Sequence, residues 1–288
     1  MILVTGATGN VGREVVKQLL ARRERVRVIT RDAKRSAHLA NHVETVVGRL
    51  EEPATLEAAL RGVTAAFLMV TGDAVKPVTG FARAARAAGC SRIAFLSTLY
   101  AGERSILLER WHADREDALR DAGVPTAVLR SGAFMTNALQ WAGSIHESGV
   151  VYDATNGART GPIAPRDIAR VASIALTEGT LDDRTVQLTG AKALTVAEQT
   201  AIIASVLGRP LQCVHTSVET AVTTLVKRGV PESFASAIRE MLERTRAGRG
   251  ALLTDAVETI TKQRPISFGS WAIENRVAFA TPPSRVPR

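Results

Sequence analysis

The chain opens with the sequence MILVTGATGNVG, residues 1–12. An apolar run leads from Ile2 to Thr5, three glycines follow at Gly6, Gly9 and Gly12, and a helical pattern begins at Val11. This order predicts a strand, a tight turn and a helix. In such a turn the first two glycines permit the sharp bend and the third permits close packing of the helix. The sequence therefore predicts the first unit of a dinucleotide-binding sheet.

The same turn predicts where a diphosphate binds. Its backbone N–H groups point at the ligand, and the N-terminus of the helix adds a partial positive charge. The glycine spacing is G-x-x-G-x-x-G, and its place between a strand and a helix supports the assignment. The residues assigned to the diphosphate are Gly6, Thr8, Gly9, Asn10, Val11 and Gly12.

The end of the second expected strand, Val26–Thr30, predicts which dinucleotide binds. An acidic residue at this position binds ribose hydroxyls, whereas an arginine favours a 2′-phosphate. Arg31 and Asp32 are both present, and Lys34 follows. We predict NADP(H) as the favoured cofactor, with NAD(H) as the alternative.

Apolar runs alternate with helical patterns through the first half of the chain, which is typical of βαβ units. Most of these runs are nearly continuous, as expected for strands that are covered on both faces. The predicted fold class is α/β, a doubly wound parallel Rossmann-type sheet. The further expected strands are Glu44–Val47, Ala65–Val70, Arg92–Ser97, Thr126–Arg130 and Val186–Thr189, and the further expected helices are Thr55–Arg61, Val75–Ala88, Arg104–Asp121, Phe134–His146, Pro165–Glu178 and Thr195–Leu207.

The pattern changes after Arg130, which suggests a second part of the molecule. We expect an NAD(P)-binding domain over residues 1–190 and a smaller, mostly helical C-terminal substrate lobe over residues 191–288, with residues 132–160 contributing to the cleft. Thr195 and Glu198 form the sequence pattern of a capping box, which predicts a helix start. Such a lobe can close a ligand cleft at the carboxyl ends of the strands.

Composition excludes several other classes of protein. With 288 residues, of which 45% are apolar, the chain can bury a core without disulfide or metal staples. Cys90 and Cys213 are too few for a disulfide framework, which favours a cytoplasmic location. No apolar run reaches about 18 residues, so we expect no membrane span. The net charge of +9 comes without a recognisable DNA-binding module, so we expect no specific nucleic acid partner.

Metal binding is also not expected. His38 and His42 stand four residues apart, but Leu39 occupies the place of the glutamate in a zinc-protease helix and no third ligand is near. The pair is interpreted as structural. We expect a monomer or a homodimer that binds a small aromatic substrate.

Five stretches give the chain a family resemblance. They are Thr5–Gly12, Arg31-Asp32, Gly48-Arg49-Leu50, Phe95–Thr98 and Val128–Asn137. With them the chain resembles the NmrA-like atypical short-chain dehydrogenases, and within these the NAD(P)H:quinone oxidoreductase type of actinobacteria. The resemblance covers nearly the whole chain. It implies an NAD(P)-binding fold with a small lobe, and it implies Gly48 and Leu50 as cofactor contacts.

The catalytic pair of the wider superfamily is absent. A tyrosine with a lysine four residues later would lower the pKa of the phenol, but Tyr100 is followed by Arg104 and Tyr152 by Asn156. Quinone reduction can proceed without the pair, because hydride transfer to an electron-poor ring needs mainly orientation and a nearby donor. His112 is a candidate proton donor, since an unperturbed histidine titrates near neutral pH; a packed histidine is the alternative.

The remaining candidates follow from the rule that such sheets bind ligands at the carboxyl ends of their strands. The catalytic candidates are Ser97, Tyr100 and His112. Further cofactor contacts are expected at Val70, Thr71 and Ser97. The substrate contacts are expected at Leu99, Tyr100, Phe134, Met135, Asn137 and Trp141, where an aromatic wall and an ordinary core are the two interpretations.

The sequence thus predicts an NAD(P)H-dependent oxidoreductase acting on a quinone or a related aromatic, polyketide-like molecule. Two alternatives stay open. One is a non-catalytic NAD(P)-sensing regulator, which the absent tyrosine–lysine pair favours. The other is an oxygenation-type tailoring enzyme on an NAD(P)-binding fold.

Overall fold

The computed structural model describes residues 1–36 and 42–280. Its central sheet has seven parallel strands in the order β3-β2-β1-β4-β5-β6-β8. The strand order reverses between β1 and β4, which is the switch point of a doubly wound sheet. The predicted fold class is confirmed. The strands are β1 (Ile2–Val4), β2 (Val26–Thr30), β3 (Glu44–Val47), β4 (Ala65–Leu68), β5 (Arg92–Thr98), β6 (Thr126–Ser131) and β8 (Thr185–Leu188).

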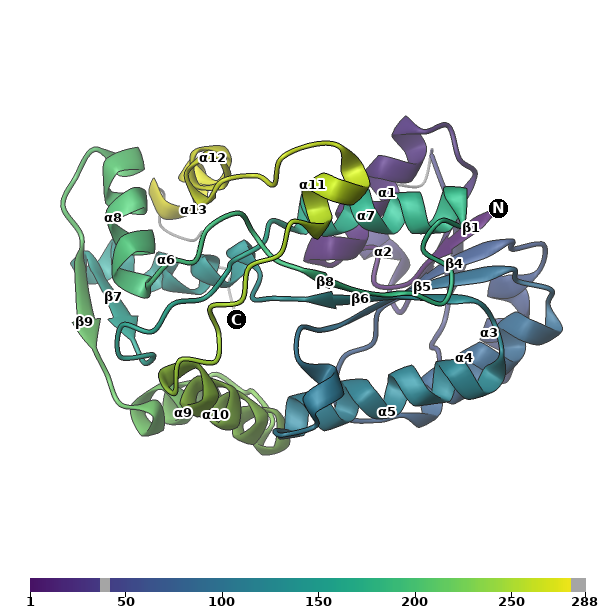
Figure 1. Cartoon of the computed structure of the whole chain (residues 1–288), viewed down its shortest axis with the longest axis horizontal. Helices are drawn as coiled ribbons and strands as arrows, with labels where there is room; N and C mark the ends of the chain where they lie inside the picture. Colours follow the sequence, from purple (N-terminus) through teal and green to yellow (C-terminus); the bar gives the residue numbers. More distant parts are fainter. Residues whose placement is uncertain (37–41, 281–288) are drawn as a thin grey trace. The chain divides into compact units, whose positions relative to one another are not determined.

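Helices cover both faces of this sheet, as Figure 1 shows. One face carries α1 (Asn10–Ala21), α7 (Pro165–Glu178) and the short α11 (Ala256–Thr261), and the other carries α3 (Pro53–Leu60), α4 (Lys76–Ala87) and α5 (Leu107–Ala122). A short helix, α2 (Ala33–Ser36), follows β2. Double coverage explains why the central strands β1 and β4, with the sequences ILV and AAFL, are entirely apolar and buried.

The core beneath the second face is built from strands and helices together. Leu3, Leu68 and Phe95 from the strands pack with Phe81 of α4 and Leu119 of α5, and all are at most 1% exposed. Burial of each such side chain stabilises the fold by about 1.5–3 kcal/mol. This core fixes the strand ends from which the candidate site is built.

The chain divides into two compact units that interleave along the sequence. The first unit contains Met1–Ser131, Pro165–Leu188 and Ala256–Gln263, and the second contains Gly132–Ala164, Thr189–Asp255 and the described residues from Arg264 to Ala280. One crossing point, at residues 188 and 189, lies beside the boundary expected at residue 190. The expected domains were continuous, whereas the structure returns to the first unit at residue 165 and again at residue 256.

The second unit has its own core and its own small sheet. Met135, Ile145, Ile203, Phe268 and Trp271 are buried together in it. A parallel pair of strands, β7 and β9, was not expected, and the helix expected over 134–146 is a 3₁₀ helix followed by an α-helix. The elements are η3 (Met135–Trp141), α6 (Ala142–Ser148), β7 (Val150–Asp153), α8 (Val196–Leu207), β9 (Gln212–His215), α9 (Val218–Lys227), α10 (Glu232–Arg246), α12 (Phe268–Glu274) and α13 (Arg276–Ala280).

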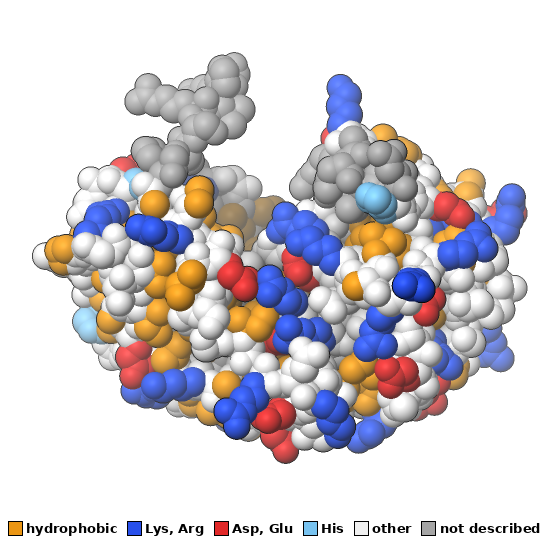
Figure 2. Space-filling model, turned by 90° about the horizontal axis from the view of Figure 1, so that it is seen from above, with side chains coloured by type: hydrophobic (Ala, Val, Ile, Leu, Met, Phe, Trp, Pro, Cys, Tyr) orange, Lys and Arg blue, Asp and Glu red, His pale blue; other side chains and the backbone are white. Residues whose placement is uncertain are grey.

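The predicted capping box at the start of α8 is confirmed. The Thr195 side chain accepts the Glu198 backbone N–H at 3.0 Å, and the Glu198 carboxylate accepts the Thr195 backbone N–H at 2.9 Å. Within the described ranges, no helix is both long and apolar enough to cross a membrane. On the face drawn in Figure 2, Lys and Arg side chains lie in several groups with acidic side chains between them.

Candidate functional site

The turn between β1 and α1 depends on two glycines. Gly6 has a positive φ of 63°, and its carbonyl accepts the Gly9 backbone N–H at 2.9 Å. A Cβ on Gly12 would lie far inside van der Waals contact of the Gly6 carbonyl oxygen. A side chain at either position would therefore deform the turn.

The N-terminus of α1 is suited to an anion. Its N-cap residue, Gly9, provides no side-chain cap, and its first turn contains no acidic residue. The N–H groups of a first helical turn have no partner within the helix, and they attract negative charge. Asn10 is exposed and Thr8 half-buried, whereas Val11 is 1% exposed and packs in the core. Val11 can thus offer a diphosphate only its backbone.

A side chain that the sequence analysis did not single out, Met69, lies over this turn. A Cβ on Gly6 would lie 2.6 Å from Met69 Cε. The Thr5 hydroxyl accepts the Met69 N–H at 2.8 Å and lies 3.2 Å from the Met69 carbonyl, to which it donates. These bonds join the ends of β1 and β4. After them, Val70 packs against the core and Thr71 is exposed.

The end of β2 presents two cations to solvent. Arg31 and Lys34 are exposed, and no hydrogen bond or ion pair to another described residue engages the Arg31 guanidinium. Asp32 is exposed as well, and its carboxylate accepts the Lys34 backbone N–H at 2.9 Å, which caps α2. The Asp32 carboxylate is therefore partly occupied, while the Arg31 guanidinium is available for a phosphate.

The neighbouring loop after β3 packs against the end of β2. The Gly48 N–H donates to the Thr30 carbonyl at 2.9 Å, and a Cβ on Gly48 would collide with the Thr55 side chain. Leu50 is partly buried against the core of the first unit. Gly48 thus has a packing role, independent of any ligand.

A buried polar network occupies the ends of β5 and β6. The Ser97 hydroxyl donates to Glu116 Oε1 at 2.5 Å. Arg130 donates from Nε to Glu116 Oε1 at 3.0 Å and from Nη2 to Oε2 at 2.6 Å. The Glu116 side chain is 2% exposed. Sequence reasoning did not select Glu116 and Arg130 as site residues, although an arginine directly after the apolar run AVL of β6 was a usable signal.

His112 lies on α5, as expected, but its pKa differs from that of an unperturbed histidine. Burial, and secondarily the charge of Arg115, lower the pKa of His112 from 6.5 to about 3. Its Nδ1 is buried without a hydrogen-bond partner, and its ring centroid is 6.2 Å from that of Phe95. The assumption of an unperturbed pKa near neutrality was therefore wrong. The imidazole is neutral at neutral pH, because no group nearby repays its desolvation as a cation.

Helix α5 also fixes the loops that follow β4 and β5. Arg115, 1% exposed, donates to the carbonyls of Gly72 and of Ala74, the latter at 3.3 Å. Arg104 pairs with Asp114 at 2.6 Å and also with Asp117. The loop between β5 and α5, which contains Arg104, therefore has a defined conformation. This loop carries Leu99, which is 5% exposed, and Tyr100, which is half-buried.

The predicted substrate residues of the second unit have unequal exposure. Met135 is 2% exposed and belongs to the core with Phe268 and Trp271, and Trp141 is partly buried against the same core. Phe134 is half-buried and Asn137 is exposed. Met135 thus matches the interpretation as ordinary core. Contact of the other three with a substrate stays a prediction.

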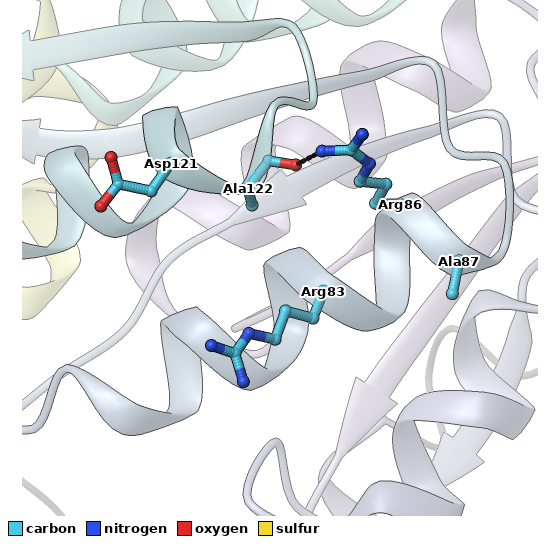
Figure 3. Close-up of a pocket in the computed structure, with 5 residues that line it drawn as sticks. All are labelled: Arg83, Arg86, Ala87, Asp121 and Ala122. Atoms are coloured by element: carbon cyan, nitrogen blue, oxygen red, sulfur yellow. Dashed lines mark hydrogen bonds between the residues drawn. The ribbon is translucent and has the colours of Figure 1, made fainter.

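Two surface hollows lie beside α4. One, of about 450 Å³, is lined by Arg83, Arg86, Ala87, Asp121 and Ala122. Figure 3 shows Arg86 of α4 reaching the Ala122 carbonyl of α5, at 2.8 Å. The helices end here, so this hollow faces the amino ends of the strands. The other, of about 760 Å³, lies between α3 and α4.

No cluster of three metal-ligating side chains occurs in the described part of the chain. Of the histidine pair considered above, His38 lies outside the described residues and His42 is exposed.

Comparison with known proteins gives consistent matches. Residues 1–252 match the NmrA-like family. The (4-alkanoyl-5-oxo-2,5-dihydrofuran-3-yl)methyl phosphate reductase of Streptomyces griseus is 39% identical over 283 residues, 97% of this chain and 99% of that protein. The NAD(P)H azoreductase of Xenophilus azovorans is 32% identical, with the same coverage of 97% and 99%.

A solved structure matches the fold. The NADPH-dependent quinone oxidoreductase of Escherichia coli, in complex with NADPH, superimposes with a TM-score of 0.84. Sequence identity is 23%, and the match covers 94% of this chain and 98% of that chain.

Proposed function

Because the chain belongs to the NmrA-like family, we propose that it is an NADPH-dependent reductase of small, electron-poor conjugated molecules. Two relatives of at least 32% identity are named as reductases, of a furanone phosphate and of azo compounds. Both substrates contain a conjugated double bond that can take a hydride at one end and a proton at the other. Quinones have the same property. The proposed substrate class is therefore wider than the aromatic molecules that the sequence suggested, and it includes conjugated molecules without an aromatic ring.

The observation that carries the cofactor proposal is the pairing of the turn with the cations after β2. The uncapped N-terminus of α1 can hold a diphosphate, and Arg31 and Lys34 are exposed at the end of the adjacent strand. A 2′-phosphate would meet these two cations. When bound, NADPH supplies a hydride from its nicotinamide ring. The ends of β4, β5 and β6 would then orient that ring and the substrate.

We assign the proton to a group other than Ser97 or His112. The Ser97 proton is committed to Glu116, and His112 is neutral. Tyr100 carries the remaining candidate hydroxyl on the loop after β5. We assign it to meet the negative charge that develops on the substrate. Tyr100→Phe should lower kcat by about 10²-fold or more with little change in NADPH affinity.

The test is NADPH consumption, followed at the nicotinamide absorbance, with simple quinones, α,β-unsaturated lactones and azo dyes. One NADPH should be consumed for each acceptor that gains two electrons and two protons. Consumption that requires an acceptor supports the proposal. NADPH binding without consumption across the panel would contradict it and favour a dinucleotide sensor.

We place this reaction in the cytoplasm. Cys90 and Cys213 are both free thiols, and Cys90 is buried, as is common in a reducing compartment.

A further inference from the structure

Three polar side chains form a row across the sheet at the ends of β5, β6 and β8. Ser97 pairs in register with Arg130, and Arg130 pairs with Gln187. Register partners on adjacent strands point to the same face of a sheet. That face is the one covered by α5, since Glu116 of α5 bonds to both Ser97 and Arg130. Helix α5 thus places one carboxylate over a polar row.

The Glu116 carboxylate has a defined set of partners. It accepts three hydrogen bonds, one from Ser97 and two from Arg130, and it is 2% exposed. The two-point contact with a guanidinium fixes the plane of the carboxylate. Its charge is compensated by Arg130, which is itself 21% exposed. A buried ion pair of this kind adds little to stability compared with apolar side chains of the same size.

The network determines what Ser97 can do. A serine hydroxyl has one proton to donate and two lone pairs to accept with. At 2.5 Å the Ser97 proton is committed to Glu116, so only its lone pairs remain for a ligand. Ser97 is therefore a hydrogen-bond acceptor at this strand end.

The network also supports the loop that carries Tyr100. A Cβ on Gly102 would lie 2.7 Å from Arg130 Nη1, so the backbone of the loop packs closely against the guanidinium. Gln187 Nε2 donates to the Leu99 carbonyl at 3.2 Å. The chain on both sides of Tyr100 is thus held by residues of the polar row.

We propose that Glu116 is a positioning residue of the reduction site. Acting through Arg130 and Ser97, it holds a hydrogen-bond acceptor and the Tyr100 loop in the arrangement that hydride and proton transfer require. The inference rests on the proposed reductase function. The role of the Glu116–Arg130 ion pair is then to orient Ser97 and the Tyr100 loop, because apolar side chains could fill the same space without loss of stability.

The double variant Glu116→Met/Arg130→Met tests this role. It replaces the ion pair with apolar side chains of similar length, so the fold should survive, with a Tm within about 5 °C of the wild type. Turnover should not survive, because misplacement of reacting groups by about 1 Å costs up to about 10²-fold. We expect kcat to fall at least about tenfold while the Kd for NADPH, measured by nicotinamide fluorescence, changes less than about threefold. Asp121→Asn, an exposed site on the same helix, is the control and should leave kcat, Kd and Tm unchanged.

Dependence on Ser97 provides a second test. Ser97→Ala should lower kcat about tenfold in the wild type, but less than about twofold in the double variant, where Ser97 is no longer held. Wild-type kcat in the folded double variant would overturn the proposal and leave the reductase function intact. If the double variant does not fold, Glu116→Gln replaces it, and unchanged kcat in that variant overturns the proposal. A wild type that reduces no acceptor overturns the reductase function and this role together.

Discussion

At the scale of a residue, His112 makes stability depend on pH. Its pKa is about 3 in the folded chain, against 6.5 for an unperturbed histidine, because burial disfavours the cation. As the pH falls below 6.5, His112 therefore becomes protonated in the unfolded chain but stays neutral in the folded chain. The contribution of neutral, buried His112 to the free energy of unfolding is fully present above pH 6.5 and is lost as the pH falls toward 3. Between pH 7 and pH 5 we expect His112 to cost about 1.5–2 kcal/mol of unfolding free energy.

Denaturant unfolding of the wild type and of His112→Gln at pH 7, 6 and 5 measures this cost. The loss of stability with falling pH should be smaller in the variant by the stated amount. Equal pH dependence in both proteins would mean that His112 is protonated in the folded chain. The rate of NADPH oxidation should also show no ionisation of His112 near neutral pH.

Arg31 makes a separate prediction about the cofactor. Its guanidinium is exposed and engages no other described residue, so a 2′-phosphate would gain a charge-assisted contact. Arg31→Ala should weaken NADPH binding by about 1.5–3 kcal/mol, roughly 10- to 150-fold, and leave NADH binding nearly unchanged. Titration of both dinucleotides by fluorescence measures the difference. Arg83→Ala, an exposed arginine on α4, is the control, and an equal loss for NADPH and NADH in Arg31→Ala would refute the phosphate contact.

At the scale of an element, the packing of α1 against its own turn decides cofactor binding. A Cβ on Gly12 collides with the Gly6 carbonyl, so Gly12→Ala must displace the helix or the turn. We expect a stability loss of about 1–3 kcal/mol and at least about tenfold weaker NADPH binding. Gly80→Ala in α4 is the matched control, because its nearest neighbour would be Leu56 Cδ1 at 3.9 Å. That variant should bind NADPH normally and gain up to about 1 kcal/mol; normal binding by Gly12→Ala would contradict this account of the turn.

Elements also show what the sequence could predict. The strands β2 and β3 and the helix α7 have the bounds expected from apolar runs and from the proline that begins α7. The short strands β7 and β9 were missed, because VVYD and QCVH are too short and too mixed to show a period. The glycine turn was recognised because its chemistry is local.

The polar network on α5 was harder to predict, since it depends on contacts between distant residues. From the sequence, Glu116 is indistinguishable from the other charged residues of a helix rich in Asp, Glu and Arg, and it would be expected on the surface. Its burial results from Ser97 and Arg130, which lie 19 and 14 residues away in the sequence. The low pKa of His112 likewise follows from its burial and from the charge of Arg115, and no spacing in the sequence reveals that burial.

At the scale of the whole molecule, the interleaving of the two units predicts that the first 190 residues do not form a stable protein. That fragment lacks α11, which packs on α7 in the first unit. It also lacks Ile203, Phe268, Trp271 and Phe279, so Met135 and Ile145 lose the core of the second unit. Each lost large apolar side chain costs about 2–5 kcal/mol, so the four together cost about 8–20 kcal/mol, which is comparable with the roughly 5–15 kcal/mol that stabilises a typical protein. We expect residues 1–190 to aggregate or to melt without a cooperative transition, and the full chain to melt cooperatively. Size-exclusion chromatography and thermal unfolding compare the two. A monodisperse 1–190 fragment that melts cooperatively and binds NADPH would instead show that the first unit needs nothing beyond residue 190.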